Sequence, residues 1–169
     1  MLDQDAWRRL IDTTHKVAQT VRDRFGLRLA FHAGAETHVE YEEQIEQLLA
    51  DTDPNLVFLC LDIGHHAYRG GDPAAFIREH HERICHLHIK NIDAGVRKRV
   101  EDEKIPFAGA VGLGMFCEPE QGMIDYHIVL AALKEVDYNG FVIVEQDMYP
   151  VAVDRPLPIA KRSRAYLRE

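Results

Sequence analysis

The alternation of helical patterns with short apolar runs constrains the fold of this chain more than any other feature. Each run is too short for a helix and is mostly apolar, which is typical of a strand buried on both faces of a parallel sheet. We expect strands at residues 27–32, 56–61, 84–90, 115–117 and 141–145.

Helices are expected between these strands. From Trp7 to Phe25 apolar residues recur at helical spacing, and Gly26 follows where a left-handed cap would end the helix. Asp72-Pro73 offers an N-cap and a proline at the first helical position. Further helices are expected at residues 41–49, 94–114 (in one or two pieces because of Pro106), 125–136 and from 159 onward.

Alternating strands and helices predict parallel βαβ units with right-handed crossovers. Five strands would allow a doubly wound sheet, but the chain begins on a helix and adds one strand-helix unit per ~30 residues, which is the spacing of a (β/α)8 barrel. We therefore expect an α/β fold of the TIM-barrel type, an N-terminally truncated portion with about five parallel strands and three strands missing. Residues 1–169 would form one partial barrel domain, in which 150–169 are a C-terminal arm and helix.

The net charge restricts the partners of the chain. A formal charge of -8 argues against nucleic acid, because few cations are available to release counterions from phosphates. No apolar run approaches the ~20 residues that cross a bilayer, and the N-terminus lacks the order of a signal peptide. These features predict a cytoplasmic protein with no membrane partner, and its three cysteines are expected to be reduced thiols.

The expected strands end on polar residues that are costly to bury. His32, Asp62, His88 and Glu145 each stand at or near the end of an apolar run. Because the carboxyl ends of parallel strands share one edge, these four side chains should meet there, where a divalent cation would balance the carboxylates. Mixed nitrogen and oxygen ligands suit manganese, cobalt, zinc or iron better than calcium.

Alternatives remain open for several of these residues. Asp62 and Glu145 could instead cap the following helices. His86 lies on the same face as His88, so only one of the two histidines need bind the metal. In the loop after His32, Glu36 or His38 could take its place as the first ligand.

Two further residues are candidates for catalysis. His65 follows Asp62-Ile63-Gly64, where the glycine lets the loop turn back over the site, so it could act as a general acid or base or hydrogen-bond the substrate. Lys90 could stabilise an enolate, and with His65 and His86 it forms the expected substrate-binding set. The simpler alternatives are a solvated histidine and a lysine in a salt bridge.

At these residues the chain resembles the xylose-isomerase-like barrel superfamily of sugar isomerases, epimerases and dehydratases, and within it the inosose (2-keto-myo-inositol) dehydratases. The resemblance covers nearly the whole chain from His32 onward. It is carried by Thr52-Asp53-Pro54, Leu61-Asp62-Ile63-Gly64-His65, His86-Leu87-His88-Ile89-Lys90, Phe116-Cys117-Glu118-Pro119 with Gly122 and Asp125, and Val142-Ile143-Val144-Glu145-Gln146-Asp147.

The resemblance implies a particular metal site. In the superfamily four strand-end residues, typically glutamate, aspartate, histidine and glutamate, hold one divalent metal ion. The last three correspond to Asp62, His88 and Glu145, and the first falls near His32, where a histidine favours the dehydratases over the epimerases. His65 matches the substrate-contacting histidine of the family. Mn²⁺ or Co²⁺ is the expected ion, with Zn²⁺, Mg²⁺ and Fe²⁺ as alternatives.

The resemblance also implies an activity, a carbon-oxygen lyase that dehydrates an inosose or similar polyhydroxylated ketone through an enediolate. An isomerase or epimerase acting on a polyol or keto-sugar is the first alternative, since reprotonating the same enediolate gives that reaction. A non-catalytic barrel fragment that binds a protein partner is the second. Because the open edge of a partial barrel exposes apolar strands, a homo-oligomer formed through that edge is also possible.

Overall fold

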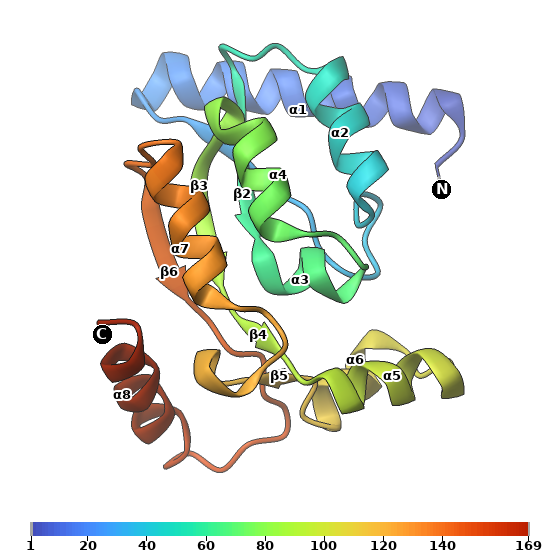
Figure 1. Ribbon diagram of the computed structural model, residues 1–169. Helices are drawn as coiled ribbons and strands as arrows, with labels where there is room; N and C mark the ends of the chain where they lie inside the picture. Colours follow the sequence, from blue (N-terminus) through green and yellow to red (C-terminus); the bar gives the residue numbers. More distant parts are fainter. Residues whose placement is uncertain (1, 169) are drawn as a thin grey trace.

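The computed structural model describes residues 2–168 and has a four-stranded parallel sheet at its centre (Figure 1). The strand order is β1-β2-β3-β6, which follows the chain, so each crossover adds a neighbouring strand. The strands are β1 (Leu29–His32), β2 (Val57–Asp62), β3 (Ile84–Ile89) and β6 (Phe141–Val144).

Helices connect the strands where the sequence predicts them, with one more at Ile63–Tyr68, where a loop was expected and the Asp62 carboxylate caps a helix instead. They are α1 (Gln4–Phe25), α2 (Glu42–Asp51), α3 (Ile63–Tyr68), α4 (Pro73–His80), α5 (Ala94–Glu103), α6 (Phe107–Gly112), α7 (Tyr126–Glu135) and α8 (Pro156–Tyr166), with 3-10 turns at His81–Arg83 and Pro119–Gln121. Gly26 ends α1 with φ 63°, and the Asp72 carboxylate accepts two backbone N–H groups at the start of α4. Residues 94–114 form two helices, separated at Pro106.

The core lies between the sheet and its connecting helices. Figure 1 shows α4 and α7 side by side in front of the strands. Phe76 and Ile77 of α4 and Val129 of α7 are buried with Leu87 of β3. Burial on this scale stabilises a fold by roughly 1.5–3 kcal/mol per large apolar side chain, which fixes the strand ends in place.

One predicted strand does not belong to the parallel sheet. Phe116–Cys117 (β5) pairs antiparallel with Asn91–Ile92 (β4) beyond the carboxyl end of β3. In this run Met115 and Phe116 are buried in the core, and the side chain of buried Asn91 accepts hydrogen bonds from the Ile92 and Ile124 N–H groups. The expectation of five parallel strands was therefore wrong. Four are present, and an eight-stranded barrel would need four more rather than three.

The C-terminal segment also differs slightly from the expectation. The helix that was expected from residue 159 begins at Pro156, because proline suits the first helical turn. None of the helices in the described part of the chain combines the length and hydropathy of a bilayer-spanning segment.

Candidate metal centre

The carboxyl ends of the four strands bring all four predicted ligands together. His88 Nδ1 lies 3.1 Å from Glu145 Oε2 and 3.5 Å from Asp62 Oδ2, and His32 Nε2 also lies 3.5 Å from Asp62 Oδ2. One donor atom from each of Asp62, His88 and Glu145 lies within 4.8 Å of the others. Metal-ligand bonds of roughly 2.0–2.2 Å place neighbouring ligand atoms about 3 Å apart, so these separations suit one small cation.

Asp62 uses its two carboxylate oxygens for different purposes. Oδ1 accepts hydrogen bonds from the N–H groups of Gly64 and His65 at 3.0 and 2.9 Å and so caps α3. Oδ2 faces the other strand ends, is buried, and is ion-paired with Lys90 Nζ at 3.0 Å. The capping role and the ligand role, which the sequence presents as alternatives, are therefore compatible in one side chain.

Lys90 is a buried cation among carboxylates. Its side chain is 2% exposed, and Nζ lies 3.0 Å from both Asp62 Oδ2 and Glu145 Oε2 and 3.1 Å from Asp147 Oδ2. Burial alone would lower the pKa of Lys90, but Asp62 and Asp147 outweigh it and raise that pKa. One ammonium facing three carboxylates leaves two negative charges at the site.

The same contacts hold Asp62 ionised. Burial on its own would raise the pKa of Asp62, but the contacts with His32, His65 and Lys90 bring that pKa well below its ordinary value. Gly64 allows this packing, because a Cβ there would overlap the Lys90 side chain and lie 2.9 Å from the Lys90 carbonyl oxygen. The first turn of α3 can therefore approach Lys90 only with glycine at this position.

Of the three candidates for the first ligand, His32 is the one that lies beside Asp62 at the strand ends. The Glu36 carboxylate accepts a hydrogen bond from the Phe107 N–H at 2.7 Å, and His38 is exposed on the loop. His32, Cys60 and His88 form a second group with suitable spacing. Burial raises the pKa of the Cys60 thiol to about 12, so a thiolate ligand is disfavoured there.

His65 lies at the border of the centre. Its Nδ1 accepts a hydrogen bond from the Ala35 N–H at 3.1 Å, so the proton of the neutral ring is on Nε2, which lies 3.8 Å from Asp147 Oδ2. Burial lowers the pKa of His65. A neutral ring that presents an N–H fits hydrogen bonding to a substrate better than strong acid catalysis.

His86 and Asp147 change the expected set of residues. His86 is paired with Cys60 and Phe141 in the sheet, one layer further from the carboxyl ends than His88, with their rings 5.4 Å apart. Asp147 reaches both Lys90 and His65 but was not predicted. The signal that could have found it is the second carboxylate in Val144-Glu145-Gln146-Asp147, two positions beyond the predicted ligand.

The donor set fits a divalent cation. Asp62 Oδ2 and His88 Nδ1 are buried 3.5 Å apart, and each lies near charged groups without a well-aligned hydrogen bond in the described chain. Buried polar atoms of this kind are rare unless a ligand or solvent satisfies them. The two unbalanced negative charges and the mixed oxygen and nitrogen donors agree with a first-row divalent ion.

Known proteins share the fold and the sequence pattern. An inosose dehydratase of Geobacillus kaustophilus is 39% identical over 166 residues, covering 98% of this chain and 53% of that relative. The crystal structure of the probable 3-DHS dehydratase AsbF from Bacillus anthracis superposes with TM-score 0.79 at 17% identity, covering 99% of this chain and 58% of its own. That of the IOLI protein with a bound zinc atom gives TM-score 0.69 at 21% identity, with 93% and 54% covered.

In each of these three proteins, the part that matches this chain is a little more than half of the protein's length. The chain spans about half the length of the curated relatives it matches, in keeping with half of the strands of a barrel. The family model described as xylose isomerase-like TIM barrel matches residues 2–169. The chain therefore belongs to the xylose isomerase-like TIM barrel family.

Proposed function

We propose that this chain carries the metal centre of a dehydratase that removes water from an inosose or a similar polyhydroxylated ketone. His32, Asp62, His88 and Glu145 would hold one divalent cation, with Mn²⁺ or Co²⁺ first and Zn²⁺, Mg²⁺ or Fe²⁺ as alternatives. The similarity to a relative called inosose dehydratase over 98% of the chain supports the substrate class. A cytoplasmic location is part of the same proposal.

One observation carries the proposal. Buried ligand atoms of Asp62 and His88 converge with Glu145 beside a buried lysine, at the carboxyl ends of three parallel strands. This edge carries the active site in barrel enzymes, because the loops that follow the strands surround it. One ammonium cannot balance the three carboxylates there, so a bound cation would reduce the repulsion between them.

Different groups at the site would carry out different parts of the proposed reaction. A divalent cation bound here would polarise a ketone and so acidify the hydrogen on the neighbouring carbon. Lys90 stays charged, so it can donate a proton to a departing hydroxyl but cannot accept one. The acceptor must then be a carboxylate, and Asp147, 3.1 Å from Lys90 Nζ, is the nearby one outside the proposed ligand set.

The neighbouring side chains would orient the substrate and exclude water. His65 presents its Nε2–H to the site for a substrate oxygen. Phe107 and Phe116 lie against the His65 ring, with centroids 5.3 and 5.5 Å away, and form an apolar wall. A less polar surrounding strengthens the electrostatic interactions on which proton abstraction depends.

The test is incubation of the chain and 2-keto-myo-inositol with Mn²⁺ or Co²⁺ in D2O, followed by mass spectrometry. The proposal predicts a product lighter by one water, absent with the Glu145→Gln variant and without metal. Deuterium uptake without loss of water would instead identify an isomerase or epimerase. No change in mass at any metal concentration would contradict catalysis by this chain and favour the non-catalytic fragment.

A further inference from the structure

Two of the helices that cover the sheet carry a second group of possible metal ligands. Glu46 lies on α2, and Glu79 and His80 are the last two residues of α4. One donor atom from each of these three side chains lies within 4.8 Å of the others. Figure 1 shows α2 beside α4, and the three residues, here called the α2–α4 cluster, join the two helices.

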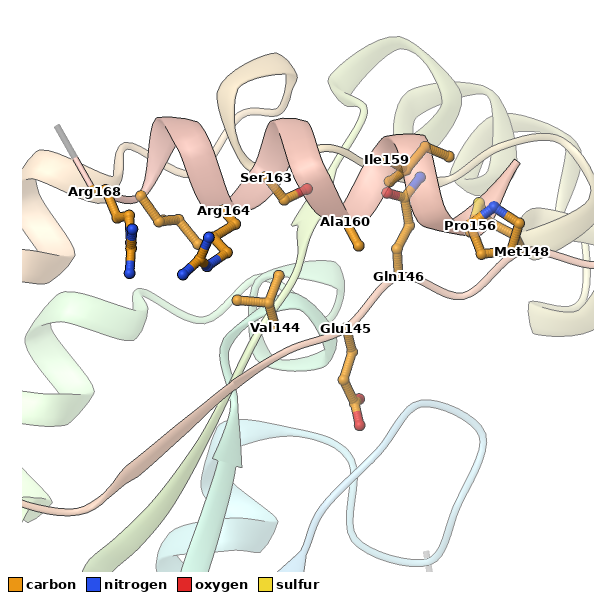
Figure 2. A pocket seen from close by; sticks show the side chains of 11 residues that line it. Val144, Glu145, Gln146, Met148, Pro156, Ile159, Ala160, Ser163, Arg164 and Arg168 are labelled. Atoms are coloured by element: carbon orange, nitrogen blue, oxygen red, sulfur yellow. The ribbon is translucent and has the colours of Figure 1, made fainter. Parts of the chain in front are cut away.

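The α2–α4 cluster is separate from the metal centre at the strand ends. Glu145 of that centre points away from α8, as Figure 2 shows, and contacts His88 near the carboxyl end of β3. His80 instead stands just before the turn His81–Arg83, which leads into the first residue of β3. The cluster therefore lies toward the amino end of the sheet, where residues of barrel proteins serve stability rather than catalysis.

The His80 ring is already oriented toward α2. It packs on the buried Phe76 side chain one turn earlier in α4, with the ring centroids 4.3 Å apart. Its Nε2 atom is buried and has no hydrogen-bond partner within residues 2–168. Glu46 Oε1 lies 3.7 Å from Nε2, which is beyond hydrogen-bond distance. A cation between the two atoms would satisfy both, as buried polar atoms normally are.

The two carboxylates of the cluster lack a basic partner in the part of the chain that the structure describes. Within it, no lysine or arginine nitrogen lies within 4.0 Å of Glu46 or Glu79. Arg78, the cation next to Glu79 in the sequence, is paired with Glu135 of α7 instead. Two carboxylates in one place repel each other, and a divalent cation would remove that repulsion.

The donor atoms indicate the kind of cation. One imidazole nitrogen and two carboxylate oxygens suit Zn²⁺, which binds such ligands at about 2.0–2.2 Å and imposes no geometry of its own. Mn²⁺ and Co²⁺ stand earlier in the order of affinities, so three ligands should hold them more weakly. The Glu46 side chain is 46% exposed, so its carboxylate can turn toward His80 Nε2 without disturbing the core.

We propose that Glu46, Glu79 and His80 bind one Zn²⁺ ion, which links α2 to α4 and stabilises the fold independently of the metal centre at the strand ends. Three protein ligands leave a fourth position for water. An ion that binds only the folded state raises Tm. For a chain of 169 residues, Zn²⁺ at 100 times its Kd should raise Tm by about 5–10 °C.

The experiment measures Zn²⁺ binding by the Glu145→Gln chain, in which the metal centre at the strand ends has lost a ligand. Titration calorimetry should show one Zn²⁺ bound at the α2–α4 cluster, and thermal unfolding should show the rise in Tm. Adding Glu46→Gln should lower the affinity by more than about 100-fold and abolish the rise, because losing a ligand costs more than losing a partner of a ligand. Adding Glu43→Gln, at an exposed position on the same helix, should change neither.

A second variant tests the contribution of α4. His80→Gln, also added to the Glu145→Gln chain, should remove the zinc-dependent rise in Tm. Circular dichroism without metal shows whether this variant is still folded. Glu46→Gln leaves the packing of His80 on Phe76 intact, so the two variants together separate loss of the ion from loss of packing.

Two outcomes would overturn the proposal. One is the absence of Zn²⁺ binding by the folded Glu145→Gln chain. The other is Zn²⁺ binding that either Glu46→Gln or His80→Gln leaves unchanged, which would place the ion elsewhere. Because every comparison is made within the Glu145→Gln chain and no turnover is measured, failure of the proposed function leaves this result unaffected.

Discussion

The two roles of Asp62 can be separated by comparing Asp62→Asn with Asp62→Ala. Asparagine retains an oxygen that can accept the Gly64 and His65 N–H groups, whereas alanine has none. Asparagine and aspartate are about equally good N-caps, and replacing either by alanine lowers the free energy of unfolding by about 1 kcal/mol. Both variants lose the negative charge that lies 3.0 Å from Lys90 Nζ.

Both variants should lose metal binding, but Asp62→Asn and Asp62→Ala should differ in thermal stability. Removing an outer partner of a metal ligand weakens binding about 10–100-fold, so losing Asp62 itself should exceed that in both variants. In a chain of 169 residues, 1 kcal/mol corresponds to about 2–4 °C in Tm, and Asp62→Ala should melt lower than Asp62→Asn by that amount. Titration calorimetry and thermal unfolding measure the two effects.

Two results would contradict these roles of Asp62. If Asp62→Asn binds metal like the unmodified chain, the carboxylate is only a helix cap. If the two variants have the same Tm, the hydrogen bonds to Oδ1 contribute nothing to the stability of α3.

Three further predictions concern the surroundings of the site. Lys90→Met should lower the metal-free free energy of unfolding by about 3–5 kcal/mol, because Asp62 loses its buried partner, and added metal should recover part of it. A Tm equal to that of the unmodified chain would contradict this. Gly64→Ala should cost about 1–3 kcal/mol and reduce metal affinity by displacing Lys90; an unchanged affinity would refute the packing argument. Burial lowers the pKa of His66 to about 4, so the unfolded state binds a proton first and stability should fall as the pH drops from about 6.5 to about 4. His66→Gln should lack this slope in thermal unfolding, and an identical slope would assign it elsewhere.

The parallel strands could be predicted from sequence because burial on both faces leaves an unbroken apolar run. The apolar run correctly predicts β2, because that strand is almost wholly buried. It misleads at residues 115–117, which are apolar because Met115 and Phe116 pack in the core outside the main sheet rather than because they lie in that sheet. Sequence alone does not separate these two reasons for burial in a run of three residues.

The convergence of the site residues followed from topology, since parallel strands end at one edge. The positions of His32 and Glu36 relative to the site did not, because they depend on the loop that turns the Glu36 carboxylate to the Phe107 N–H. The dual use of Asp62 was also hidden, since the sequence cannot assign separate partners to two oxygens of one carboxylate. Asp147 was missed because it lies beyond the strand, in a segment without regular periodicity.

The most direct test of the central claim is the metal content and metal affinity of the purified chain beside its Glu145→Gln variant. Glu43→Gln, at an exposed position on α2, is the matched control. About one Mn²⁺ or Co²⁺ should bind per chain, and this binding should be lost with Glu145→Gln and kept with Glu43→Gln. Equal binding by all three proteins, or none by the unmodified chain, would contradict a metal centre at the strand ends.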